Sequence, residues 1–167
     1  VIAGSALFAA SVGNLITMPA LFAQREFAPE HYAAVITRVW SVGQVLYHLF
    51  HQHEGRRIVI ACFASHVHRV QQIADAAVAF GRKVATLGLS MKKNVRLARE
   101  MGLLRIPDHA LVDIDDVRDL PPGQVCVIST GSQGEPMSAL ALMAQRNNRW
   151  LEIDADDTVI LSSHPIP

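Results

Sequence analysis

From about Glu54 onward, short apolar runs alternate with longer segments in which apolar residues recur at helical spacing. The runs are rich in Val, Ile and Leu, as buried strands are, and they predict strands at 57–63, 83–87, 110–112, 125–129 and 157–161. The segments between them predict helices at 67–80, 90–101, 113–120 and 135–145. Because strands alternate with helices, we expect a three-layer α/β fold with a mainly parallel, twisted sheet and right-handed crossovers.

Turn and cap residues set the expected ends of these helices. Gly81 and Gly102 are typical of the position that follows a helix, and Ser90 is expected to cap the start of the second helix. Pro136 suits the first position of the helix that follows the strand at 125–129. A strand, a Gly-rich loop and a helix N-terminus would then meet around 129–137, an arrangement that can hold a phosphate with backbone N–H groups.

Residues 1–39 differ in character from the rest of the chain. The stretch 1–23 carries no charged residue and has roughly the length of a membrane span, although a buried helix would have the same composition. It lacks the basic lead-in of a signal peptide. Continued through 24–27, it is similar over a short length to a helix of major facilitator transporters. We therefore expect an apolar N-terminal segment of separate origin at 1–39 and one α/β domain at 40–167.

Charge is balanced overall but unevenly distributed. The net charge of zero argues against a broad, purely electrostatic nucleic-acid binder. Between Glu54 and Arg105 the chain has ten Lys and Arg residues and three acidic residues. Beyond Arg105 it has three Lys and Arg residues and ten acidic residues. This asymmetry fits either a basic face for a polyanion or ordinary solvated helix faces. Cys62 and Cys126 lie in apolar runs without metal-type spacing, so we expect a reducing, cytoplasmic location, with membrane association through 1–23 as the alternative.

Polar residues follow three of the predicted strands at the point where each strand ends. Because ligands of parallel sheets gather at the carboxyl ends of strands, these residues are expected to line one cleft. Hydroxyls and loop N–H groups suit phosphate, and an arginine adds a charge-assisted contact. The predicted binding residues are Ser65, His66, His68, Arg69, Thr130, Gly131, Ser132, Gln133, Gly134, Glu135, Ser162, Ser163 and His164.

Each of these signals also has a purely structural interpretation. Gly131 and Gly134 would serve a tight turn equally well. His66 and His68 have a spacing that suits zinc at a strand end, whereas in a helix start they would point to different faces. Glu135 would meet the helix dipole or orient a neighbouring group. Six further acidic residues are typical of turns and helix starts: Asp113, Asp115, Asp116, Asp154, Asp156 and Asp157. No nucleophile–His–acid triad is recognisable, so no catalytic or metal-ligating residue is predicted.

Several segments, taken in order, carry a family resemblance. They are 62–72 (CFASHVHRVQQ), 81–84 (GRKV), Ser90-Met91 with Asn94, Ile106-Pro107, 130–137 (TGSQGEPM) and 157–167 (DTVILSSHPIP). Together they resemble the β-CASP domain of the ribonuclease J family over roughly 41–167. The run Thr-Gly-Ser-Gln-Gly-Glu-Pro is the most specific of them.

The resemblance implies a fold, a substrate and a cofactor. The family inserts a parallel α/β β-CASP domain into a metallo-β-lactamase domain, and it cuts RNA internally or from the 5′ end with two zinc ions. The partners that the resemblance implies are single-stranded RNA, the metallo-β-lactamase domain, and further copies of the protein in a homodimer or homotetramer. The β-CASP part would close over the RNA strand.

The chain also departs from the family pattern. The His-x-His-x-Asp-His motif that supplies zinc ligands is absent, and 1–39 do not match the family. We therefore expect a fragment or fusion that binds RNA but shows no metal-dependent cleavage by itself. The alternatives are a nucleotide- or phosphate-binding α/β module without nuclease activity, and a membrane-tethered fusion product.

Overall fold

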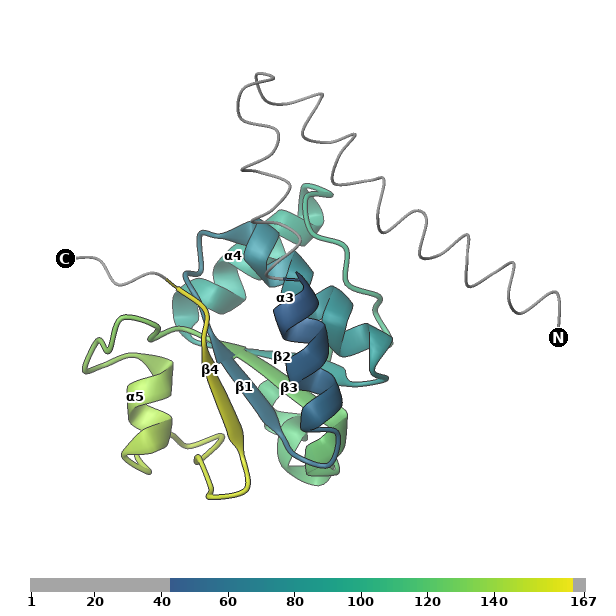
Figure 1. Ribbon diagram of the computed structural model, residues 1–167. Helices are drawn as coiled ribbons and strands as arrows, with labels where there is room; N and C mark the ends of the chain where they lie inside the picture. Colours follow the sequence, from purple (N-terminus) through teal and green to yellow (C-terminus); the bar gives the residue numbers. More distant parts are fainter. Residues whose placement is uncertain (1–42, 164–167) are drawn as a thin grey trace, which may run out of the picture. The chain divides into compact units, whose positions relative to one another are not determined.

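The computed structural model of the protein describes residues 43–163 (Figure 1). Residues 43–52 are helical, and from Leu46 onward the chain belongs to one compact unit. The elements follow in the order β1 (Ile58–Ala61), α3 (Val67–Ala79), β2 (Lys83–Leu87), α4 (Leu89–Glu100), η2 (Ile114–Asp119), η3 (Pro122–Gln124), β3 (Val125–Ser129), α5 (Ala139–Ala144) and β4 (Thr158–Leu161). The segment 1–39 and the membrane alternative for 1–23 lie outside the described residues. Within 43–163, no helix is both long enough and apolar enough to cross a bilayer.

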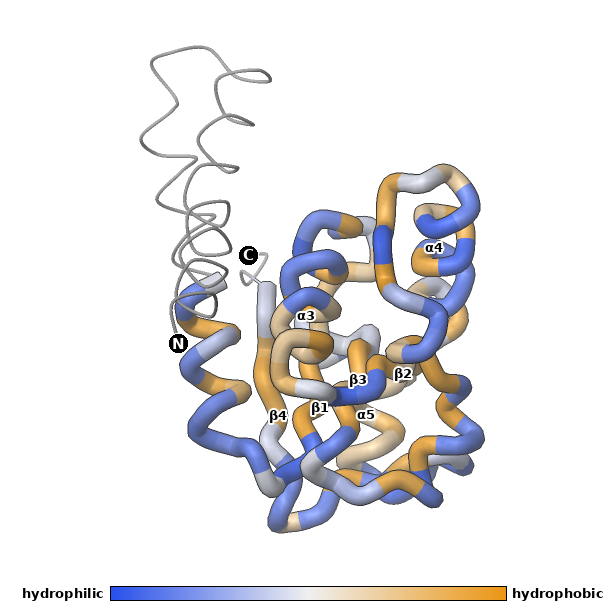
Figure 2. The backbone as a smooth tube through the Cα atoms, turned by 90° about the vertical axis from the view of Figure 1, so that its right-hand side faces the viewer, coloured by the Kyte–Doolittle hydropathy of each residue, from blue (hydrophilic) through white to orange (hydrophobic). Residues whose placement is uncertain are grey.

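The four strands form a single parallel sheet in the order β2-β3-β1-β4. Ile58 at the start of β1 lies opposite Cys126 of β3 and Thr158 of β4, so the three strands begin at the same level. The prediction of an α/β fold with a parallel sheet is confirmed. Figure 2 shows the hydrophobic colour along the strands, and β1, β2 and β3 are buried over almost their whole length, as expected for strands covered on both faces. Val159 and Leu161 of the edge strand β4 are exposed.

Alternate strand residues build two cores, one on each face of the sheet. On one face, β-strand residues such as Val59 and Val127 pack in a cluster with Ile114 of η2 and Met143 of α5. The residues of opposite parity face α3 and α4 and are fully buried as well: Ile58, Ile60, Val84, Cys126 and Ile128. Helical elements on both faces give the three layers that the alternation of strands and helices predicted.

The sequence placed β2 and β3 correctly to the residue, but two other expectations were wrong. The predicted strand at 110–112 is only an isolated bridge between Leu111 and Val84. The chain turns away immediately after it, because Asp113 caps η2 by accepting a hydrogen bond from the N–H of Asp115.

The second error concerns the start of α4, which begins at Leu89 rather than after Ser90. Gly88 occupies the N-cap position with a φ of 109° and no side-chain cap. A Cβ at Gly88 would lie 2.6 Å from the Thr130 Oγ1, so only glycine fits there. A tertiary contact has overridden the local preference for a capping serine.

A buried arginine fastens the amino edge of the sheet. Arg82, which is 2% exposed, lies just before β2. Its guanidinium donates to four backbone carbonyls, at distances of 2.6 Å to 3.2 Å: those of His53, Glu54, Arg56 and Val125. Burial lowers the pKa of Arg82, and Cys126 and Glu54 oppose that shift. Arg82 therefore joins the turn at 53–56 to β3, a role that its sequence position did not reveal.

The two cysteines are free thiols inside the protein. Burial raises the pKa of Cys62 to about 11 and that of Cys126 to about 12. Both side chains are therefore protonated and act as small apolar core residues, as their place in apolar runs predicted.

Candidate functional site

Three loops meet at the carboxyl edge of the sheet. They follow β1, β3 and β4, and hydrogen bonds join them directly. Arg69 Nη1 donates to Ser162 Oγ at 2.6 Å. Gln133 Nε2 lies 2.9 Å from Ser163 Oγ, and that hydroxyl donates to the carbonyl of Ser132 at 3.1 Å. The sequence-predicted residues from all three loops are thus brought together at one edge.

The loops after β1 and β3 border the point where the chain's direction across the sheet reverses. From β1 the chain crosses through α3 on one face to β2, and from β3 it crosses past α5 on the other face to β4 (Figure 1). Because β1 and β3 are neighbours and the chain leaves them toward opposite faces, a crevice is expected at the carboxyl edge between the loops 64–69 and 130–135. Such switch points are where open parallel sheets bind ligands. The strand order that creates this switch point could not be predicted from the sequence.

His66 and Arg69 have different tasks at the start of α3. The Nδ1 of His66 accepts the backbone N–H of Arg69 at 3.1 Å and so caps the helix, which confirms the helix-start interpretation of this histidine. Arg69 sends its guanidinium across to Ser162. Within the described part of the chain, no carboxylate forms an ion pair with Arg69, and its buried Nε has no hydrogen-bond partner. Its positive charge at the carboxyl edge is therefore not neutralised by an acidic side chain of residues 43–163.

The loop after β3 is held in shape by its own side chains. Thr130 Oγ1 accepts the N–H of Ala139 at 3.4 Å, and Glu135 Oε2 accepts the N–H of Gln133 at 3.2 Å. Gly131 has a φ of 111°. The expectation of a helix from 135 was wrong, because 131–138 remain a turn and Ser138, not Pro136, begins the helix by accepting the N–H of Ala141. Glu135 is therefore a loop-fixing residue rather than a first-turn acid.

The other predicted residues lie around the same edge, with one exception. Ser65 and His68 are exposed beside the start of α3, and Gly134 turns the loop with a φ of 76°. Ser162 and Ser163 follow β4 directly, since the N–H of Ser162 still bonds to the Ala61 carbonyl at 2.8 Å. His164 lies outside the described residues.

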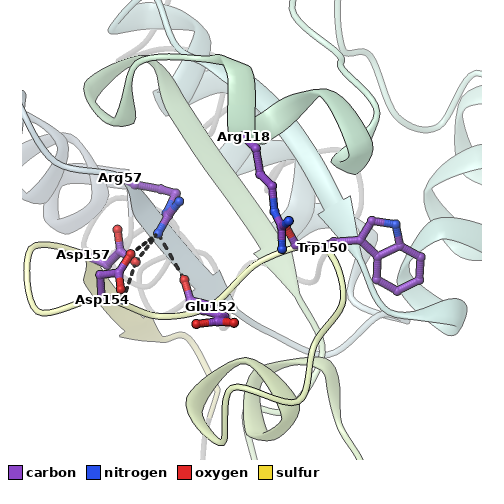
Figure 3. Close-up of polar contacts among 6 residues, drawn as sticks. All are labelled: Arg57, Arg118, Trp150, Glu152, Asp154 and Asp157. Atoms are coloured by element: carbon purple, nitrogen blue, oxygen red, sulfur yellow. Dashed lines mark hydrogen bonds and ion pairs between the residues drawn. The ribbon is translucent and has the colours of Figure 1, made fainter.

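An ion pair positions the start of β4. Arg57 Nη2 lies 2.5 Å from Asp157 Oδ2 and 3.6 Å from Asp154 Oδ2, and it donates to the Glu152 carbonyl at 3.1 Å (Figure 3). Asp157 is almost fully buried, which the expectation of a surface turn did not foresee. A signal was present, because Arg57 and Asp157 each directly precede an apolar strand and so become neighbours once β1 and β4 pair in register.

A comparison with protein-family models matches residues 55–167 to the family described as ribonuclease J, beta-CASP domain. The chain belongs to this family. The resemblance carried by the sequence motifs is thereby confirmed. All four strands, the Arg82 anchor and the loops at the carboxyl edge lie inside the matched β-CASP region.

Curated relatives of the β-CASP domain support the same assignment. Ribonuclease J of Mycobacterium tuberculosis is 49% identical over 127 residues, which are 76% of this chain and 23% of that protein. Ribonuclease J of Thermus thermophilus is 48% identical over 111 residues, 66% of this chain and 19% of that protein. Ribonuclease J2 of Bacillus subtilis is 40% identical over 111 residues, 66% of this chain and 20% of that protein. The chain spans about a fifth of the length of these relatives.

The described part of the β-CASP domain does not fit a two-zinc centre. Among residues 43–163, no three His, Cys, Asp or Glu side chains come together in a way that could hold a metal ion. His66 uses its Nδ1 to cap α3, and Asp157 is engaged by Arg57. The chemistry that these residues can supply is binding: hydroxyls, amides and one guanidinium without a carboxylate partner at the carboxyl edge.

Proposed function

We propose that this β-CASP domain grips single-stranded RNA along the carboxyl edge of its sheet, as part of a ribonuclease J-like nuclease. The observation that carries the proposal is the meeting of three loops at this edge, where Arg69 reaches Ser162 and has no carboxylate partner among residues 43–163. The loop residues Ser65, Ser132, Gln133 and Ser163 supply hydroxyls and an amide suited to phosphate and sugar. The guanidinium of Arg69 supplies the charge-assisted contact.

The remaining predicted residues divide into two roles in this proposal. His66, Thr130, Gly131, Gly134 and Glu135 hold the loops in the shape that binding requires. His68, Ser162 and His164 complete the surface around Arg69. This division rests on the capping and loop contacts described above.

We further propose that the longer protein is a zinc-dependent ribonuclease that acts internally or from the 5′ end of RNA. Its zinc ligands would come from a metallo-β-lactamase domain, since residues 43–163 offer no cluster of metal-ligating side chains. A cytoplasmic location and a homodimer or homotetramer belong to the same proposal. The family membership supports it.

The Arg69→Ala variant tests the RNA-binding proposal. We expect the affinity for single-stranded RNA to fall about tenfold, which corresponds to about 1.4 kcal/mol. The slope of log affinity against log salt should flatten by about 0.7, the amount that one phosphate contact contributes on a single strand. Fluorescence anisotropy with a labelled oligonucleotide at several salt concentrations measures both quantities.

The matched control is Arg96→Ala. Arg96 is an exposed arginine on α4 that forms a surface ion pair with Glu100 at 3.6 Å. Its loss should leave affinity and slope unchanged. A variant Arg69→Ala that melts at a lower temperature but keeps the salt slope would show a structural role instead. Binding of mononucleotides with no gain for longer RNA would favour the nucleotide-binding module.

A further inference from the structure

A cavity lies at the carboxyl edge of the sheet, beside the end of β2. It has a volume of about 230 Å³ and is lined by Thr86, Lys92, Leu111, Val112, Asp113 and Ile114. Thr86 is the next-to-last residue of β2, and Lys92 stands in the first turn of α4. The cavity is smaller than the pockets that enclose drug-sized ligands, and it suits one nucleobase or sugar.

The end of β2, where the cavity lies, adjoins the loop after β3. Gly88, which follows β2, lies against the side chain of Thr130, which follows β3. The N–H of Thr130 also donates to the carbonyl of Leu87 at 3.3 Å. An RNA strand that follows the carboxyl edge from the loops of β1 and β3 toward β2 would therefore reach the cavity next.

The polar groups of the cavity suit a nucleotide. Lys92 Nζ lies 3.4 Å from Asp113 Oδ1, and both side chains remain partly exposed, at 39% and 59%. The Asp113 carboxylate is ionised, because the N–H of Asp115 and the nearby Lys92 hold its pKa below the usual range. Lysine, carboxylate and the Thr86 hydroxyl offer a phosphate contact, an acceptor and a donor within one small volume.

The ring of Trp150 contacts two cationic side chains, Lys92 and Arg149, beside this cavity. Lys92 Nζ lies 5.5 Å from the centre of the Trp150 ring, and the Arg149 guanidinium lies 4.0 Å from it. Arg118 fixes this segment by donating to the carbonyls of Arg149 and Trp150, at 2.9 Å and 2.6 Å, while the indole extends away from Arg118 (Figure 3). Cation–π contacts of this kind keep flexible cations in place.

We propose that the cavity is a subsite for one nucleotide of single-stranded RNA, with its base or sugar inside and its phosphates against Lys92 and Arg149. The inference rests on the proposed RNA binding at the crevice and extends the path of the strand to β2. Trp150 is a positioning residue that holds the two cations. Stacked aromatic and basic side chains are a common means of following a single strand.

Trp150 fluorescence tests the subsite directly. The chain has two tryptophans, so Trp40→Phe leaves Trp150 as the sole emitter. Titration with an RNA of about 16 nucleotides, near the upper limit of single-strand site sizes, should change its emission, whereas RNA of about 4 nucleotides, near the lower limit, should bind at the crevice and leave it unchanged. Emission that stays constant while anisotropy reports binding of the longer RNA would overturn the subsite.

Substitutions separate this inference from the proposed function. Lys92→Ala and Lys92→Gln should each weaken binding of the longer RNA about fivefold and leave binding of the shorter RNA unchanged. The neighbouring exposed Lys93→Ala is the matched control and should change neither. Arg69→Ala should weaken both. If only the Arg69 effect appears, the subsite is wrong and the crevice stands; if neither RNA binds, both proposals fail.

Discussion

Replacing Arg82 by Ala is expected to lower the free energy of unfolding by about 3 to 5 kcal/mol, because several buried acceptors lose their donor at once. The guanidinium serves four carbonyls at the amino edge, and alanine would leave those acceptors without their donor. The total stability of such a domain is about 5 to 15 kcal/mol, so the variant would lose much of it. Urea denaturation followed by circular dichroism measures the change.

Two further variants serve as controls for the Arg82→Ala measurement. Arg56→Ala removes an exposed arginine of the same turn and should cost less than about 0.5 kcal/mol. Arg82→Lys keeps the charge but cannot span four carbonyls, so its cost should fall between the two. Equal stabilities of the Arg82→Ala and Arg56→Ala variants would contradict the anchoring role.

Replacing Gly131 by Ala is expected to destabilise the protein by about 3 kcal/mol and to weaken RNA binding at the crevice. Its φ of 111° is unfavourable for any other residue. The added Cβ would lie 2.8 Å from the Leu140 Cβ and would also meet the Ser138 side chain, and a Cβ cannot rotate away from such a contact. The loop that carries Ser132 and Gln133 would have to move.

Gly134→Ala is the matched control in the same loop. Its φ of 76° is also left-handed, but nothing lies within 4 Å of the added Cβ. We expect only the backbone strain, about 1 to 2 kcal/mol, and RNA affinity close to that of the unchanged protein. Urea denaturation and anisotropy on both variants provide the comparison. If Gly134→Ala were as damaging as Gly131→Ala, steric contact at Gly131 would not be the cause.

The sequence predicted the strands well because local signals and burial agree there. The runs at 83–87 and 125–129 are apolar, rich in β-branched residues and bounded by turns, and both are strands over those residues. The helix after β1 could be predicted equally well, from its apolar residues at helical spacing and from Gly81 at its end. Where local signals met tertiary contacts, prediction failed, as at Gly88, whose contact with Thr130 leaves no room for a capping side chain.

The candidate site was predictable only in part. The presence of polar residues after three strands followed from sequence, and a parallel sheet requires those ends to share an edge. The order of strands, which places β1 beside β3 and so creates the switch point, depends on long-range packing that no local pattern encodes. The same holds for the pair Arg57 and Asp157, which meet across 100 residues of chain.

Cross-linking of the protein to single-stranded RNA containing 4-thiouridine, followed by mass spectrometry, tests the central claim that the carboxyl edge is the RNA-binding surface. The account predicts cross-linked peptides that contain 64–69, 130–135 and 162–164, and a marked loss of these products with the Arg69→Ala variant. Cross-links concentrated at the amino edge, in 53–57 and 121–124, and insensitive to Arg69→Ala would contradict it.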